Sequence, residues 1–141
     1  MTNAKYDAEV IVCVTAQLEC ERLIQIGKTA AGDDARLQVL SVQPENQEAE
    51  ARAKDLGNLF EIAKKAGAEI AIYYNDSPVL MAAAHIRRCH AKEIITGFPE
   101  AETTNHFVDM LRALMPDVRI TMVRKDGVLH VMEPASVAVS K

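Results

Sequence analysis

The sequence predicts an α/β fold: a doubly wound, mostly parallel five-stranded sheet with helices on both faces and an antiparallel strand at its C-terminal edge. Short apolar runs, typical of strands buried on both faces, alternate with longer segments whose apolar residues recur every three or four positions, as in amphipathic helices. The 141 residues contain no linker and no internal repeat. We therefore expect a single domain over residues 1–141, with its core at 8–124 and an edge hairpin and tail at 125–141.

The first strand is predicted at residues 9–15, where an uninterrupted apolar run makes Cys13 a buried residue of a central strand. Residues 18–31 then carry apolar or small side chains at helical spacing, and Gly32 is placed to end that helix. Residues 35–42 form a second strand, whose polar beginning indicates one more exposed end.

The middle of the chain repeats this alternation. An apolar stripe at residues 49–63 marks a second helix that ends at Gly67, and residues 68–74 form the third strand. Ser77 followed by a proline suits the start of a third helix, which runs to about Cys89.

The last part of the chain completes the parallel sheet and adds a hairpin. Residues 94–97 form a fourth strand, a fourth helix runs as far as Pro116, and residues 118–123 form the fifth strand. A short polar turn at residues 124–127, which contains Asp-Gly, leads to a sixth strand at 128–132. Because so short a turn cannot hold a crossover helix, the sixth strand should pair antiparallel with the fifth.

Composition excludes several classes of function. The net charge is −4, no basic run occurs and tryptophan is absent, so nucleic acid is not an expected partner. No apolar run approaches the roughly 20 residues of a membrane helix, and the N-terminus lacks a signal pattern, so we expect a cytoplasmic protein without a membrane partner. The three cysteines lack C-x-x-C spacing, which fits a reducing compartment.

No motif supports catalysis. The chain has no nucleophile elbow, no G-x-x-x-x-G-K-[ST] loop and no G-x-G-x-x-G turn after the first strand. A phosphate-accepting receiver domain needs an acidic cluster where this chain has Val14, Thr15 and Ala16, and a PP-type ATP pyrophosphatase needs a Ser- and Gly-rich turn there. We expect no enzyme, and any slow nucleotide hydrolysis would be incidental.

A metal site is not expected either. His85, Cys89 and His90 lie close together in the sequence, but Arg87 and Arg88 are adjacent. Neighbouring cations disfavour binding of a metal dication.

Ligands of doubly wound sheets bind beyond the carboxyl ends of the strands, where the strand order reverses. The predicted strands end at or just before four groups of residues at this edge: Thr15, Ala16 and Gln17; Val42 and Gln43; Asn75 and Asp76; Thr96 and Gly97. The sequence therefore predicts the ligand crevice there.

Five segments together resemble a universal stress protein domain: VIVCVT (10–15), ERLI (21–24), AGAEI (66–70), AKEIITG (91–97) and FVDML (107–111). The likeness spans about residues 8–124, and its nearest form is the stress-protein-like domain of Kdp-type potassium sensor kinases. It implies a small cytoplasmic α/β domain, in a family where many members dimerise, some bind ATP or AMP and others bind no nucleotide.

The resemblance also implies a ligand site. In nucleotide-binding members, a strand-one aspartate, a main-chain contact after strand two and a glycine loop of the form G-x2-G-x9-G-[ST] hold the nucleotide. By position, Thr15 stands in place of the aspartate, with Ala16 next to it, Val42 supplies the strand-two contact, and Thr96 and Gly97 open the loop.

The loop itself departs from the family pattern. Glu100 replaces the second glycine, Asn105 and His106 stand where the last glycine and hydroxyl belong, and the loop is several residues too short. Glu100 and Glu102 would repel a triphosphate. AMP or a cyclic dinucleotide therefore suits the crevice better than ATP, and protonated His106 could attract one phosphate.

The resemblance further implies a dimer, because universal stress proteins commonly pair their fifth strands edge to edge. The hairpin here either covers that edge or pairs with another chain, and we expect a homodimer involving residues 118–139. The interface candidates are Val118, Ile120, Met122, Val128, His130 and Met132.

Two functions remain open after these steps. The first is a non-catalytic regulatory module that binds an adenine nucleotide and changes its contacts with a sensor kinase or another signalling protein. The second is a ligand-free module of the same fold that acts through interaction and dimerisation.

Overall fold

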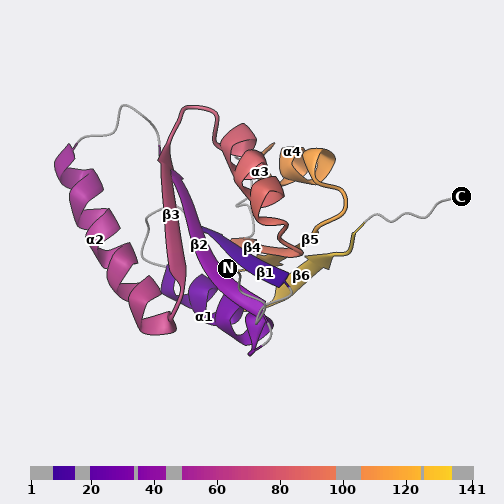
Figure 1. Cartoon of the computed structure of the whole chain (residues 1–141), viewed down its shortest axis with the longest axis horizontal. Coiled ribbons are helices and arrows are strands. Elements are labelled where there is room, and N and C mark those ends of the chain that lie inside the picture. The colour runs from indigo at the N-terminus through magenta and orange to yellow at the C-terminus, as the bar shows by residue number, and fades with distance from the viewer. Residues whose placement is uncertain are drawn as a thin grey trace, which may run out of the picture.

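The computed structural model describes residues 8–14, 20–33, 35–43, 49–97, 106–124 and 126–134. In chain order these residues form β1 (Ala8–Val14), α1 (Cys20–Ala31), β2 (Ala35–Gln43), α2 (Ala49–Ala66), β3 (Glu69–Tyr74), α3 (Pro78–Cys89), β4 (Glu93–Gly97), α4 (His106–Leu114), β5 (Arg119–Val123) and β6 (Leu129–Met132) (Figure 1). The described bounds lie within two residues of those expected from the apolar patterns, and Thr15, the expected end of the first strand, lies outside the described residues.

The strands form one six-stranded sheet in the order β3-β2-β1-β4-β5-β6. The first five strands are parallel, and β6 pairs antiparallel with β5. The predicted fold class is therefore confirmed, as are the interior position of β1 and the antiparallel edge hairpin.

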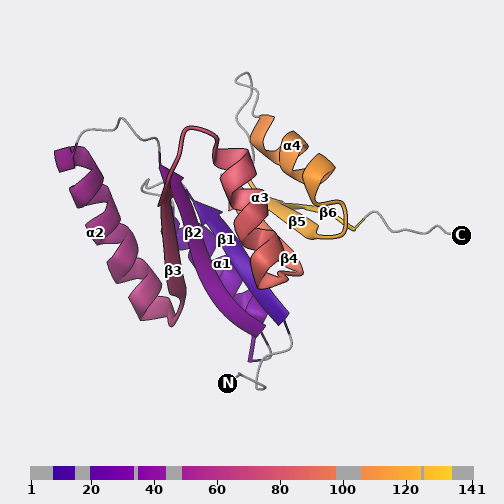
Figure 2. The same cartoon turned by 45° about the horizontal axis from the view of Figure 1, so that its top comes forward.

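Helices α1 and α2 cover one face of the sheet, and α3 and α4 cover the other (Figure 2). The apolar side chains of α1 and α2 pack on one face, against residues such as Val10, Val12 and Ile95. Those of α3 and α4 pack on the other face, against residues such as Ile11 and Ile94. Consecutive residues of β1 and β4 thus enter opposite cores, which explains why these strands are apolar throughout rather than alternating.

Gly27 allows α1 to lie close to the sheet. A Cβ atom at this position would overlap Val12 Cγ2 and lie 3.1 Å from Leu37 Cδ1. Both of these side chains are buried. The missing side chain therefore fixes how near the helix comes to β1 and β2.

Several helix ends follow the sequence expectations. Gly32 and Gly67 end α1 and α2 with positive φ angles of 57° and 74°, where a side chain would be strained. His90 ends α3 in the same left-handed conformation, with φ of 57°. Ser77 occupies the N-cap of α3 but makes no side-chain cap; its amide donates to Asn75 Oδ1 at 2.7 Å instead.

The hairpin between β5 and β6 is built as its sequence predicts. The Gly127 amide donates to the Arg124 carbonyl at 2.9 Å, the Arg124 amide donates to the Val128 carbonyl at 2.9 Å, and Gly127 has φ of 90°. The Val128 amide donates to Asp126 Oδ1 at 3.0 Å. These bonds form a tight turn that requires glycine at its left-handed position.

Candidate functional site

The carboxyl ends of β1 and β4 mark the switch point of this sheet. The chain proceeds outward from β1 through β2 to β3, and then crosses to the opposite side of β1 to form β4. The connections that follow β1 and β4 therefore leave on opposite sides of these two neighbouring strands. The crevice between such connections is where doubly wound folds bind ligands.

Three of the predicted ligand residues lie at this end within the described chain. Thr96 is buried near the end of β4, Gly97 is its last residue, and Val42 lies near the end of β2 and packs against the core under α3 and α4. Since β1 lies between β2 and β4, Val42 and Thr96 flank the central strand.

The remaining predicted ligand residues fall at or beyond the limits of the described structure. Thr15, Ala16 and Asn105 lie outside the described residues, as do Glu100 and Glu102 of the expected loop. His106 is the first residue of α4, which places its backbone at the carboxyl side of the sheet.

Gly97 continues β4 as a regular strand residue opposite Val123, and its φ angle is not positive. Among the described residues, a Cβ atom at this position would meet nothing within 4 Å.

A polar network under α3 was missed from the sequence. It joins Gln38 of β2 and Tyr73 of β3 to His85 and Arg88 of α3. An Arg88 Nη2–H donates to the Tyr73 hydroxyl oxygen at 2.8 Å, and Tyr73 Oη lies 2.8 Å from His85 Nδ1. His85 Nε2 contacts Gln38 Oε1.

The donors and acceptors around His85 favour one tautomer of its imidazole. Because arginine can only donate, the Tyr73 hydroxyl is free to donate its own proton to Nδ1, and Nε2–H then donates to the Gln38 carbonyl oxygen. This arrangement requires neutral imidazole. Burial lowers the pKa of His85 from its ordinary 6.5, and the Arg88 guanidinium lowers it further.

The carboxylate of Glu9 lies next to this network. Glu9 of β1 is 7% exposed and lies 3.6 Å from Arg36, which also contacts Glu69 at 3.0 Å. Burial raises the pKa of Glu9 above its ordinary 4.5, although Arg36 opposes this effect. The attraction of Arg36 thus only partly offsets the cost of burying the charged carboxylate of Glu9.

The cysteine beside this network is not an activated nucleophile. Cys89 Sγ lies 3.5 Å from His85 Nε2, but burial and the Glu9 carboxylate raise the pKa of the thiol above 9.0. A low thiol pKa is what reactive cysteines need. Within the described ranges, no three His, Cys, Asp or Glu side chains form a group able to hold a metal ion.

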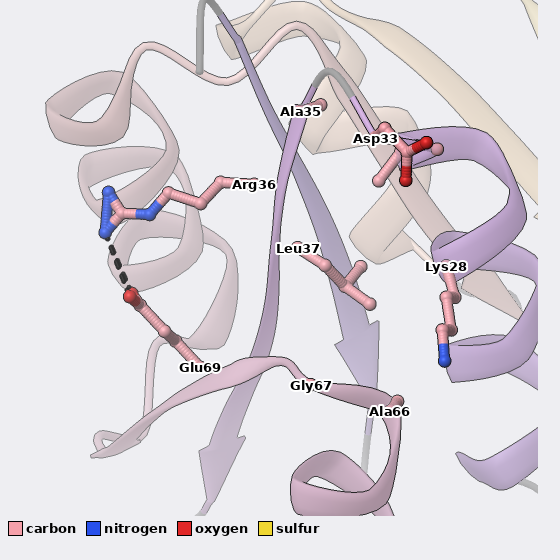
Figure 3. A pocket seen from close by; sticks show the side chains of 10 residues that line it. Lys28, Asp33, Ala35, Arg36, Leu37, Ala66, Gly67 and Glu69 are labelled. Carbon is pink, nitrogen blue, oxygen red and sulfur yellow. Dashed lines mark hydrogen bonds and ion pairs between the residues drawn. The ribbon is translucent and has the colours of Figure 1, made fainter. Parts of the chain in front are cut away.

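The described residues also form surface hollows away from the switch point. A pocket of about 460 Å³ lies at the opposite end of the sheet, where α1 and α2 end; Figure 3 shows Arg36 and Glu69 paired on one side and Lys28 and Asp33 on the other. A groove of about 590 Å³ runs between α1 and β6 over β4 and β5, with Ile26, Leu129 and Val131 in its walls.

The interface residues predicted from the sequence fall into two groups. Val118 and Ile120 are buried in the core of their own chain, and Met122 and Met132 are partly buried against the same core. Val128 and His130 are exposed on the hairpin. The dimer itself stays a prediction.

Comparison with solved structures identifies the fold. A universal stress protein from Archaeoglobus fulgidus superposes with a TM-score of 0.59 at 15% identity, covering 77% of this chain and 87% of its own. A member of the universal stress protein family from Burkholderia pseudomallei gives 0.52 at 15% identity, covering 79% and 92%. No protein-family model and no curated sequence matches the chain.

The chain therefore has the universal stress protein fold, and its sheet ends in the antiparallel strand β6. No helix of the described residues is long and apolar enough to cross a membrane.

Proposed function

We propose that this protein is a regulatory module of the universal stress protein family that binds an adenine nucleotide at the switch point between β1 and β4. The observation that carries the proposal is the crossing of the chain at β1, with Gly97 at the carboxyl end of β4, where no described residue lies within 4 Å of an added Cβ atom. A glycine at such a position lets a ligand approach the main-chain groups directly.

The ligand class follows from charge. Glu100 and Glu102 follow β4 in the sequence, and a triphosphate at this end would meet their negative charge. AMP and cyclic dinucleotides carry fewer charges than ATP and are the favoured ligands. Cys89 lies beside His85, but burial raises the pKa of its thiol above 9.0, and the role proposed here is non-catalytic.

The proposal extends to cellular context. A small domain of this fold acts in the cytoplasm by presenting a ligand-dependent surface to a signalling protein, and the sequence likeness to the stress-protein-like domain of Kdp-type sensor kinases favours a kinase as that partner. The signal would be the concentration of the nucleotide.

Thermal unfolding with AMP, ATP and a cyclic dinucleotide tests the proposal. A ligand at 100 times its Kd stabilises the folded state by about 2.7 kcal/mol, which corresponds to a rise in Tm of roughly 8 °C for a chain of this size. The variant Gly97→Val should keep the fold, since its side chain meets open space, but should lose the shift. Gly57→Ala, on the exposed side of α2, is the matched control and should retain it.

Two negative results together would contradict nucleotide binding. If no nucleotide changes the Tm and mass spectrometry of the purified protein finds no bound ligand, the nucleotide proposal is wrong.

The exposed hairpin favours a second candidate, a ligand-free module that acts through protein interaction. Val128, Leu129 and Val131 are 51%, 46% and 47% exposed on the hairpin at the sheet edge. Clustered apolar side chains on an edge strand favour association. Molar mass in solution should fall when residues 127–141 are removed; an oligomer that survives the truncation contradicts this function.

A further inference from the structure

On the side of the sheet that lies beyond β4, the terminal strand among the described residues is β6, not β5. β6 covers the outer edge of β5 from Val123, opposite Leu129, to Ile120, opposite Met132. Association through this part of β5 therefore requires that the hairpin first open, whereas no described strand lies beyond β6.

The hydrogen-bond pattern of the hairpin determines which main-chain groups point outward. The Arg124 amide donates to the Val128 carbonyl, so these two residues form a hydrogen-bonded pair. Bonded and non-bonded pairs alternate along an antiparallel ladder. His130 and Met132 therefore point their main-chain groups toward β5, and Leu129 and Val131 point theirs toward the open edge.

The side chains of β6 also divide between the two faces. Leu129 and Val131 line the groove beside α1, whereas Met132 packs against the core under α3 and α4. By alternation, Val128 and His130 lie on the same face as Met132. Both faces of this short strand thus carry apolar side chains next to its open edge.

We propose that a second copy of this chain pairs with β6 about a two-fold axis that passes through His130. In this antiparallel register Leu129 lies opposite Val131 of the partner subunit, twice by symmetry, and Val128 lies opposite Met132 of the partner subunit. The outward main-chain groups of Leu129 and Val131 form the hydrogen-bonded pairs, and the two imidazoles face each other across the axis.

Side-chain chemistry favours this register over its neighbour. A shift that places Val131 on the axis would put Leu129 opposite Glu133 of the partner subunit, and Val128 opposite Pro134 of the partner subunit. Glu133 already pairs with Arg119 at 3.2 Å. Aliphatic cross-strand pairs stabilise an antiparallel ladder, while a carboxylate beside leucine gains no partner. The register centred on His130 gives every exposed apolar residue of β6 an apolar partner.

The proposal rests on the interaction function given above and specifies its partner. Because β6 has four residues, the paired strands bury less than the roughly 1,200 Å² of a standard stable interface. A weak dimer follows, so mass should be measured by sedimentation over a wide range of protein concentration, with a rise toward twice the chain mass at the upper end.

Cysteine cross-linking tests the register. In a background with Cys20 and Cys89 changed to Ser, His130→Cys should give a disulfide-linked dimer on mild oxidation, since opposed residues of a non-bonded pair are about 4.5 Å apart at Cα. Val131→Cys should not, because its symmetry mate lies on a diagonal at about 7–8 Å, beyond the usual disulfide span. The background protein alone should remain monomeric on denaturing gels.

The outcomes of cross-linking and sedimentation distinguish an error in the register from an error in the interaction function. Cross-linking through Val131→Cys and not through His130→Cys would overturn the register and keep the interaction function. A dimer that neither cysteine links would overturn the register centred on His130 and its neighbour centred on Val131. A chain that stays monomeric at every concentration would overturn both the register and the interaction function.

A charged substitution provides a second, independent measurement. Val131→Asp should lower the association constant by tenfold or more, because it places a carboxylate against Leu129 of the partner subunit. Leu80→Asp is the matched control, since Leu80 is 59% exposed on α3, away from β6. Equal effects of the two variants, at equal folded content by circular dichroism, would contradict the assignment.

Discussion

Gly27 should be the position where adding a single methyl group costs most stability. The substitution Gly27→Ala places Cβ onto Val12 Cγ2 and within 3.1 Å of Leu37 Cδ1. Val12 is fully buried in the centre of the sheet, with no exposed surface, so it cannot rotate into solvent. The helix must instead move away from β1 or the core must repack.

The magnitude follows from two opposed effects. Overpacking a close-packed core costs about 1–3 kcal/mol, while replacing glycine by alanine inside a helix stabilises by roughly 0.5–1 kcal/mol. We expect a net loss of about 1–2 kcal/mol for Gly27→Ala, or a fall in Tm of roughly 3–6 °C. Gly57→Ala isolates the helix effect, because a Cβ there meets nothing within 4 Å.

Urea denaturation of the two variants measures this difference. Gly57→Ala should raise the free energy of unfolding by roughly 0.5–1 kcal/mol, whereas Gly27→Ala should lower it. Adding Val12→Ala to Gly27→Ala should recover part of the loss, with a coupling energy of about 1 kcal/mol or more. If Gly27→Ala is as stable as Gly57→Ala, α1 does not pack on the sheet as described.

The other predictions concern the network under α3 and the hairpin turn. The pKa of His85 is lower than 6.5 in the folded state, so the unfolded chain binds a proton more readily, and the contribution of His85 to stability is present above pH 6.5 and lost as the pH falls below it. His85→Gln should therefore flatten the pH dependence of the free energy of unfolding between pH 7.5 and 5. An unchanged slope would contradict this assignment. The raised pKa of Glu9 has the opposite sign: its contribution is present at low pH and is lost as the pH rises above the ordinary 4.5. Glu9→Gln should therefore raise the Tm at pH 7 and not at pH 4, and a lower Tm at pH 7 would show that the Arg36 pair prevails over burial. Gly127→Ala places a side chain on a residue with φ of 90°, so it should lower the free energy of unfolding by about 1–2 kcal/mol and weaken any dimer. Wild-type stability of this variant would rule out the described turn.

Much of the fold could be predicted because local signals agreed with one another. The apolar runs of β1 and β4 are continuous, since one side of each strand faces α1 and α2 and the other faces α3 and α4. Gly32 and Gly67 were recognisable helix ends because few other residues adopt positive φ. The Asp-Gly turn likewise indicated the antiparallel β6.

The candidate site could be predicted only in part. Thr96 and Gly97 were identified because parallel strands end at a common edge, and this required only the order of the elements. The conformation of Gly97 was not predictable, because glycine is compatible with both a turn and a regular strand.

The polar network had no local signal. Gln38 and His85 are 47 residues apart in the sequence, and Tyr73 lies in a different strand. Glu9 sits within an otherwise apolar strand, and Gln38 lies between the apolar residues Leu37 and Val39; these positions indicate buried partners but cannot identify them.

By itself the sequence determined the class of fold, the order of its elements and the edge of the sheet where a ligand would bind, because these depend on periodicity and on turn residues a few positions apart. Only the tertiary structure decided that His85 lies between Tyr73 and Gln38 under α3, and that Gly27 sets the approach of α1 to the sheet. Each of these depends on contacts between residues distant in the chain, and a side chain acquires such partners only when the sheet is assembled.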